Sequence, residues 1–369
     1  MTALPHDELK NGRPVSLPAL TFAGGTRNLR RPLLRWIVLV TLLVLQASTS
    51  MAGEIGHYAA GVMNIRDLAM PEPGFYAVLY NYAYRTDQLN DRHGDEVGAV
   101  TVQGPFGRRK VTVRLDVNVD AYALSPALVW VSNWSLLGAK VGALVAPSFG
   151  NTSVGAALSS STGRGGQAEA SQFGVGDLFV QPVWLGWTGD HYDVAFGMGF
   201  YAPIGKYDVE SVTLPHLGTI KAEAADNIGL GFWTQQTQLA GYWYPFNNKG
   251  TAIGLGLTHE INTKKADFDL TPGQNLSLNW GVSQFLPITS DHTLLLEVGP
   301  TGYDTWQVTN DSGRLSTGVR DEVHAAGLQL GLTHVPWNLA VNFHWFHEYA
   351  ARDRFQGDVL GLSIAKKFL

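Results

Sequence analysis

The connections between the β-like segments of this chain alternate between long and short. Reading back from the C-terminus, the irregular stretches are Ala350–Gln356, Val335–Trp337, Asp304–Asp321, Leu286–Asp291, Thr263–Pro272, Pro245–Gly250, Pro203–Ile228, Thr188–Asp190, Asn151–Val175, Ser135–Gly138 and Arg85–Lys110. In this order every odd stretch is long and polar, and every even one is about a turn. This alternation is typical of a transmembrane β-barrel, which has short periplasmic turns and longer outer loops. Eleven connections predict twelve strands, an even number, with both termini on the periplasmic side.

Within the segments, apolar residues alternate with polar or small ones. In Leu276–Val282, for example, the apolar residues interleave with Ser277, Asn279 and Gly281. Successive residues of a strand point to opposite faces, so each segment has one apolar face. A soluble sandwich alternates in the same way, but these segments run to roughly 10–13 residues, the length that a tilted strand needs to cross a bilayer. The sequence therefore predicts an all-β fold, a transmembrane antiparallel up-and-down β-barrel.

One segment leaves the number of strands open. Val111–Trp134 is twice the usual length and is interrupted by Ser125 and Pro126. If it forms two strands, another strand must lie within Asn151–Gln172, and fourteen strands become the alternative. Proline suits an edge or a kink in a sheet. We therefore treat the segment as one bent strand and predict about twelve.

The N-terminus carries the pattern of a secretory signal. Three arginines between Arg30 and Arg35 precede the apolar run Trp36–Leu45, and the small residues Ser50 and Ala52 follow it. This order of basic, apolar and small residues is that of a signal peptide, and the run is too short to span a bilayer. The predicted organisation is an N-terminal extension with the signal peptide at 1–52, a periplasmic segment and candidate plug at 53–73, and the outer-membrane barrel at 74–369.

Charge and the final strand indicate the expected partners. Without residues 1–52 the chain has 20 basic and 29 acidic residues, which argues against nucleic acid. Acidic residues in the first outer loop could hold divalent cations against lipopolysaccharide, so outer-membrane lipid and lipopolysaccharide are expected partners. Leu360, Leu362, Ile364 and Phe368 share one face of the last segment. That segment resembles the terminal strand that the barrel assembly machinery recognises.

Several short motifs, in this order and spacing, resemble one family. They are His57–Gly61, Pro71–Tyr76, Gly174–Asp177, Ala202–Tyr207, Asn227–Gly231, His259–Thr263 and Thr271–Gly273. The family is the outer-membrane barrel family labelled "putative MetA-pathway of phenol degradation", and the resemblance runs from about Glu54 to the end. His259 departs from the tyrosine expected before the glutamate, while Glu260 is retained. The resemblance implies a bacterial outer-membrane transporter for small hydrophobic or aromatic permeants, but it supplies no binding residues.

Polar residues opposite the apolar faces are candidates for lining the lumen. A basic side chain that faces lipid near the bilayer midplane costs about 2–4 kcal/mol, so charged side chains should point inward. Trp233 is added because it shares a strand face with Gln235 and Thr237. Two interpretations stay open, a selective pore lining and a buried lattice of ion pairs. The candidates are Arg114, Asp116, Asp120, Asp193, Trp233, Glu260, Glu297, His344 and Glu348.

No motif predicts catalysis, a cofactor or a metal site. His344 and His347 fall on opposite faces of a strand, as do His259 and Glu260. The chain is therefore predicted not to be an enzyme and to bind no cofactor or metal. The predicted function is a channel for passive uptake of small hydrophobic or aromatic compounds. The alternative is a structural or adhesive outer-membrane barrel without a transport role.

Overall fold

The computed structural model describes residues 55–103, 110–160, 165–214, 218–224 and 227–368. The predicted signal peptide at 1–52 lies outside this range. The described part contains seventeen strands and one 3-10 helix, η2 (Val335–Trp337). It contains no helix that is both long and apolar enough to cross a membrane.

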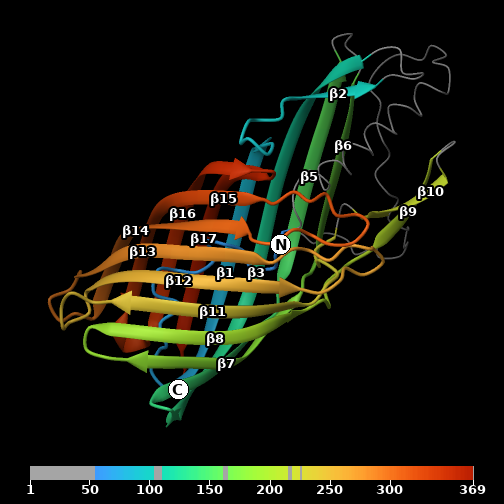
Figure 1. Cartoon of the computed structure of the whole chain (residues 1–369). Helices are drawn as coiled ribbons and strands as arrows, with labels where there is room; N and C mark the ends of the chain where they lie inside the picture. The colour runs from blue at the N-terminus through green and yellow to red at the C-terminus, as the bar shows by residue number, and fades with distance from the viewer. Residues whose placement is uncertain (1–54, 104–109, 161–164, 215–217, 225–226, 369) are drawn as a thin grey trace, which may run out of the picture.

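The strands follow one another around the barrel with antiparallel pairing. The first ten are β1 (Gly74–Leu89), β2 (Ala99–Gln103), β3 (Lys110–Leu136), β4 (Ala139–Ala146), β5 (Phe149–Ser160), β6 (Gly165–Val175), β7 (Leu178–Thr188), β8 (Tyr192–Ala202), β9 (Val209–Leu214) and β10 (Gly218–Glu223). The others are β11 (Thr234–Trp243), β12 (Thr251–Asn262), β13 (Asn275–Pro287), β14 (Leu294–Gln307), β15 (Glu322–His334), β16 (Leu339–Arg352) and β17 (Phe355–Lys367). Because β1 pairs with both β3 and β17, the sheet closes on itself (Figure 1).

The barrel wall consists of twelve crossings, as the sequence predicted. β5 pairs with the first half of β3 and β4 with the second half, so β4 and β5 lie end to end beside β3. In the same way, β6 pairs with β5 and β7 pairs with β4. Each end-to-end pair is therefore one crossing, interrupted by a two-residue break at Pro147 or at Gly176. β3 itself is a single strand of 27 residues through Ser125 and Pro126, which confirms the bent-strand interpretation.

Arg85–Lys110 and Pro203–Ile228, expected to be irregular, contain β2 and the β9–β10 hairpin, and the structure corrects two further predicted loops. Asn151–Val175, expected to be irregular, forms most of the β5–β6 hairpin, which continues the barrel wall together with β2 and the first half of β3 (Figure 1). Ala350–Gln356, expected to be a long loop, is only the short turn between β16 and β17 with the strand ends on either side. In both places polar strand residues had the composition of a loop because they lie toward the outer end of the barrel, where polar side chains can face water on either side.

The two faces of the wall differ in polarity. On the last three strands, apolar side chains such as Leu328, Leu330 and Leu360 are exposed on the outer face. Their neighbours Gln329 and Glu348 point inward and are each only 1% exposed. An apolar exterior around a polar interior is the pattern of a barrel that sits in lipid.

The N-terminal segment 55–73 lies inside the barrel and forms no strand. It is a chain of turns, with backbone hydrogen bonds from Val62 to Ala59, from Asp67 to Asn64 and from Ala69 to Arg66. Leu68 and Met70 of this segment form a buried cluster with inward-facing residues of the wall, among them Trp184 and Tyr242. The core of the molecule is therefore the packing between this segment and the barrel wall.

Candidate functional site

The N-terminal segment is held along the lumen by inward-facing polar side chains. Buried Glu260, 2% exposed, accepts a hydrogen bond of 2.9 Å from the backbone of Tyr58. Gln329 accepts one of 2.8 Å from the backbone of Ile65. Asn64 donates to Ser363 over 2.7 Å. Because these partners come from β12, β15 and β17, the segment is bonded to widely separated parts of the wall.

Arg66 fixes the segment near the periplasmic end of the lumen. Its Nε donates to Glu297 over 2.9 Å and to Ser283 over 2.8 Å. Its two terminal nitrogens donate to the carbonyls of Lys249 and Gly250, in the short turn between β11 and β12. All three guanidinium nitrogens are thus engaged. Removing only one member of the Arg66–Glu297 ion pair is costly, because the remaining charge stays buried without a partner.

Asp177 joins the outer end of the segment to two loops. One of its carboxylate oxygens accepts from the backbone of Gly205 over 2.8 Å. The other accepts from the backbone of Leu230 over 2.9 Å and lies 2.9 Å from Nε2 of His57. A Cβ on Gly205 would lie 2.8 Å from the Asp177 carboxylate, so this close approach requires glycine. The motifs around His57, Asp177, Gly205 and Leu230 therefore converge at one point.

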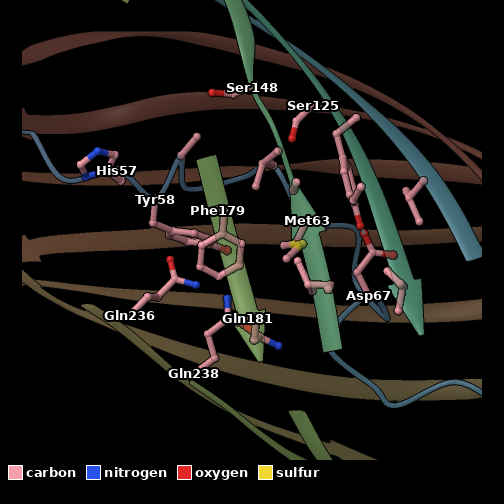
Figure 2. A pocket seen from close by; sticks show the side chains of 18 of the residues that line it. His57, Tyr58, Met63, Asp67, Ser125, Ser148, Phe179, Gln181, Gln236 and Gln238 are labelled. Carbon is pink, nitrogen blue, oxygen red and sulfur yellow. Dashed lines mark hydrogen bonds between the residues drawn. The ribbon is translucent and has the colours of Figure 1, made fainter. Parts of the chain in front are cut away.

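A cavity of about 540 Å³ remains between the segment and the wall (Figure 2). Its wall side comes mainly from β1, β3, β4, β7, β8 and β11, and its other side from the N-terminal segment. It reaches from Ser148 and Ile228, on the outer side, to Pro71 and Trp184, toward the periplasmic side. Aromatic and aliphatic side chains form most of its surface: Tyr58, Met63, Leu68, Tyr76, Val78, Tyr80, Tyr82, Val129, Leu144, Phe179, Trp184, Tyr201, Ile228 and Leu230.

Polar groups enter the cavity at a few positions only. Gln181, Gln236 and Gln238 lie together on one side, near Tyr58 and Phe179 (Figure 2). Asp67, from the N-terminal segment, accepts a hydrogen bond of 3.0 Å from the hydroxyl of Tyr80. Burial raises the pKa of Asp67 above its usual value, because the lumen solvates the carboxylate poorly.

Five of the nine predicted lumen residues point inward and are buried. They are Asp193, Glu260, Glu297, His344 and Glu348. Glu260, Glu297 and His344 contact the N-terminal segment, at Tyr58, Arg66 and Asn64. Asp193 accepts from Tyr244 and Lys249, and Glu348 accepts from Tyr84 and Tyr303. None of the five lines the 540 Å³ cavity. Their contacts therefore favour the interpretation as a buried polar lattice over the interpretation as a pore lining.

Arg114, Asp116 and Asp120 do not face the lumen. Asp120 lies opposite Arg85 of β1 and forms an exposed ion pair with it, whereas the next residue, Ala121, lies opposite inward-facing Tyr84. Arg114 and Asp116 have the same parity as Asp120 and pair with each other on the outer face, with the Arg114 side chain 74% exposed. The cost of a charge facing lipid does not apply here, because this half of β3 extends beyond the other strands (Figure 1).

Trp233 also lies on the outer face, 50% exposed, beside Phe200. It precedes β11, on which the inward residues are Thr234, Gln236 and Gln238. Both faces of this strand begin with polar residues, so the alternation alone does not identify the inner one. Gln236 and Gln238, which line the cavity from β11, were missed for the same reason.

The described residues contain no group of three or more histidine and acidic side chains placed to hold a metal ion. The closed barrel, the apolar exterior and the occupied lumen define the class of protein: it is an outer-membrane β-barrel of the bacterial type. The chain matches the family described as "Putative MetA-pathway of phenol degradation" over residues 86–364, and it belongs to that family. No curated protein matches it.

Solved structures of outer-membrane proteins are similar to this chain at low sequence identity. The COG4313 outer membrane channel from Pseudomonas putida F1 has a TM-score of 0.57 and 15% identity, covering 83% of this chain and all of the other. A FadL homologue from Pseudomonas aeruginosa has a TM-score of 0.38 and 11% identity, covering 87% of this chain and 97% of the other. The likeness to the first shows that the fold is that of an outer-membrane barrel.

Proposed function

We propose that the protein is an outer-membrane channel through which small hydrophobic or aromatic compounds diffuse passively. The observation that carries this proposal is the apolar cavity beside the N-terminal segment. Its 540 Å³ falls within the range of about 300–1,000 Å³ of small-molecule sites. Family membership agrees with the proposal, as does the fold shared with the Pseudomonas putida protein, which is itself an outer membrane channel.

The cavity suits apolar permeants better than ions. Burial of apolar surface contributes about 25 cal/mol per Å², so an aromatic ring is more stable between Tyr80, Phe179 and Trp184 than in water. Small ions gain nothing from such walls and lose hydration. The proposed channel therefore conducts ions poorly while it admits uncharged rings.

Filling the cavity tests this function. Ala127 lies in the middle of β3, is buried and lines the cavity. Ala127→Trp should occupy the space and reduce the initial uptake rate of a radiolabelled aromatic hydrocarbon to that of cells lacking the protein. Leu128→Trp is the matched control, because Leu128 is the next residue of the strand and faces outward.

Both variants must first be shown to be folded in the outer membrane by heat-modifiable gel mobility. Uptake by Ala127→Trp at the rate of the unsubstituted protein would contradict the proposal. It would then favour the adhesive or structural alternative.

A further inference from the structure

Asp67 of the N-terminal segment has one carboxylate oxygen that the protein leaves without a partner. Its three hydrogen bonds come from the backbone and side-chain nitrogens of Asn64 and from the Tyr80 hydroxyl, and all three end on Oδ2. No described residue donates to Oδ1, and Oδ1 is not among the fully buried polar atoms that lack a partner. Because Asp67 is only partly buried and lines the cavity, Oδ1 is open to the cavity and can accept a hydrogen bond from a ligand.

The charge of this carboxylate is not balanced by the protein. Arg66, Asp67 and Asp177 are the Lys, Arg, Asp or Glu residues among the described lining of the cavity. Arg66 donates to Glu297 and to two backbone carbonyls, and both oxygens of Asp177 accept hydrogen bonds from the protein. Buried charges are normally paired, because an unpaired charge loses its hydration without compensation. A cationic ligand in the cavity would supply the partner that Asp67 lacks.

The pairing of β1 with β3 leaves space beside this carboxylate. Three large residues of β1 face three small residues of β3, and all six line the cavity: Tyr82 opposite Ala123, Tyr80 opposite Ser125 and Val78 opposite Ala127. The small side chains leave room over β3 next to the tyrosines. Asp67 lies on the other side of the cavity from Gln236 and Gln238 (Figure 2). Aromatic rings attract a cation that lies within about 6 Å of their faces, so the tyrosines suit both an apolar body and a positive charge.

We propose that Asp67 and the tyrosines beside it form a binding site for hydrophobic amines, compounds in which a protonated primary amine is attached to an apolar body. The ammonium group donates to Oδ1 of Asp67, and the apolar body lies over β3. Small inorganic cations lack such a body and lose their hydration in the cavity, and anions are repelled by the carboxylate. This proposal rests on the proposed function and extends it from uncharged rings to one class of organic cation.

Fluorine NMR titration of the refolded protein in micelles of an uncharged detergent tests the site. The probes are 4-fluorobenzylamine, the neutral 4-fluorobenzyl alcohol, which has nearly the same shape, and the anion 4-fluorobenzoate. At neutral pH and physiological ionic strength, the unsubstituted protein should bind the amine about tenfold or more tightly than the alcohol, because the attraction between ammonium and carboxylate is weakly screened in the lumen. It should bind the benzoate more weakly than the alcohol. Binding to empty micelles is measured separately and subtracted.

Asp67→Asn should lose the preference for the amine and keep the affinity for the alcohol, because asparagine has the same size and its oxygen can still accept from Tyr80. Glu72→Gln is the matched control. It removes the same charge from the same segment, but Glu72 is largely exposed, pairs with Lys140 and does not line the cavity. It should keep the preference. Equal affinity for amine and alcohol in the unsubstituted protein would overturn the proposal, as would a preference that survives in folded Asp67→Asn.

Uptake measurements separate this proposal from the proposed function. In cells, Asp67→Asn should take up the aromatic hydrocarbon at the rate of the unsubstituted protein, because the hydrocarbon makes no use of the carboxylate. If the unsubstituted protein takes up the hydrocarbon but binds amine and alcohol equally, only the amine site is rejected. If it prefers the amine but takes up neither the amine nor the hydrocarbon, the site stands and the channel function is rejected.

Discussion

At the scale of single residues, Asp177 organises the outer side of the lumen. One carboxylate joins His57 of the N-terminal segment to the backbones of Gly205 and Leu230. Its own carbonyl accepts from Ser148, at the break between β4 and β5. Two loops and the segment thus depend on one buried side chain, and the backbone of the same residue bonds to the strand break.

Asp177→Ala should lower the free energy of unfolding by about 3 kcal/mol or more, because a hydrogen bond to a charged group contributes about 1.5–3 kcal/mol. Urea titration of the refolded barrel in lipid vesicles measures this loss. Asp358→Ala is the control, since Asp358 is half exposed on the outer face and bonds only to Trp345 and His347. Its loss should stay below about 1 kcal/mol. Similar losses for both variants would show that Asp177 has no special role.

The residue positions that the sequence could predict were those where one face is clearly apolar. Glu260, Glu297 and Glu348 alternate with leucine, valine or aromatic neighbours, and all three point inward. Arg114 was misplaced because the alternation gives two faces but does not show which strand half lies outside the bilayer. The contacts of Asp177 could not be predicted, because they join segments far apart in the sequence. Only the glycines in these motifs indicated close packing.

At the scale of elements, the N-terminal segment and the twelve crossings depend on each other. The inward faces of β12, β14, β15 and β17 carry polar residues that bond to the segment, and the segment lacks regular structure because the wall supplies its partners. Gln329 and Glu260, for example, accept hydrogen bonds from backbone groups that a strand or helix would have satisfied internally. We interpret the segment as a plug.

Loosening the plug at its periplasmic end should increase ion flow. Arg66→Ala/Glu297→Gln removes the ion pair without leaving a buried carboxylate unpaired, so the barrel should still fold. Single-channel recordings in planar bilayers should then show more frequent and longer open steps, with severalfold higher mean conductance. Arg352→Ala/Glu322→Gln removes a more exposed pair between β16 and β15 and is the control. Equal conductance for the two double variants would reject a plugging role.

The element pattern was largely predictable because a bilayer imposes it. Strands must be long enough to cross, must alternate and must be joined by turns on one side. β5 and β6 are exceptions. They extend past the membrane-crossing part of the wall, so the bilayer does not impose the alternation of apolar and polar residues on them. The path of segment 55–73 was not predictable, because no periodic pattern accompanies a chain that binds through single side chains.

At the scale of the whole molecule, the N-terminal segment occupies most of the lumen, and one apolar passage lies beside it. The polar contacts of Glu260 and Glu297 hold the plug to the wall, and the cavity lies mainly along β1, β3 and β7. This division explains how a barrel could exclude ions and still admit uncharged rings. A general porin would instead have an open, water-filled centre.

The most direct test of this arrangement is a crystal of the protein soaked with 4-bromotoluene and measured at the bromine absorption edge. If the cavity is the passage, an anomalous peak should lie within it, between Tyr80, Phe179 and Trp184. Bromine found only on the lipid-facing surface, for example in the apolar groove formed by Pro300, Leu328 and Trp345, would contradict the assignment of the cavity as the path of the permeant.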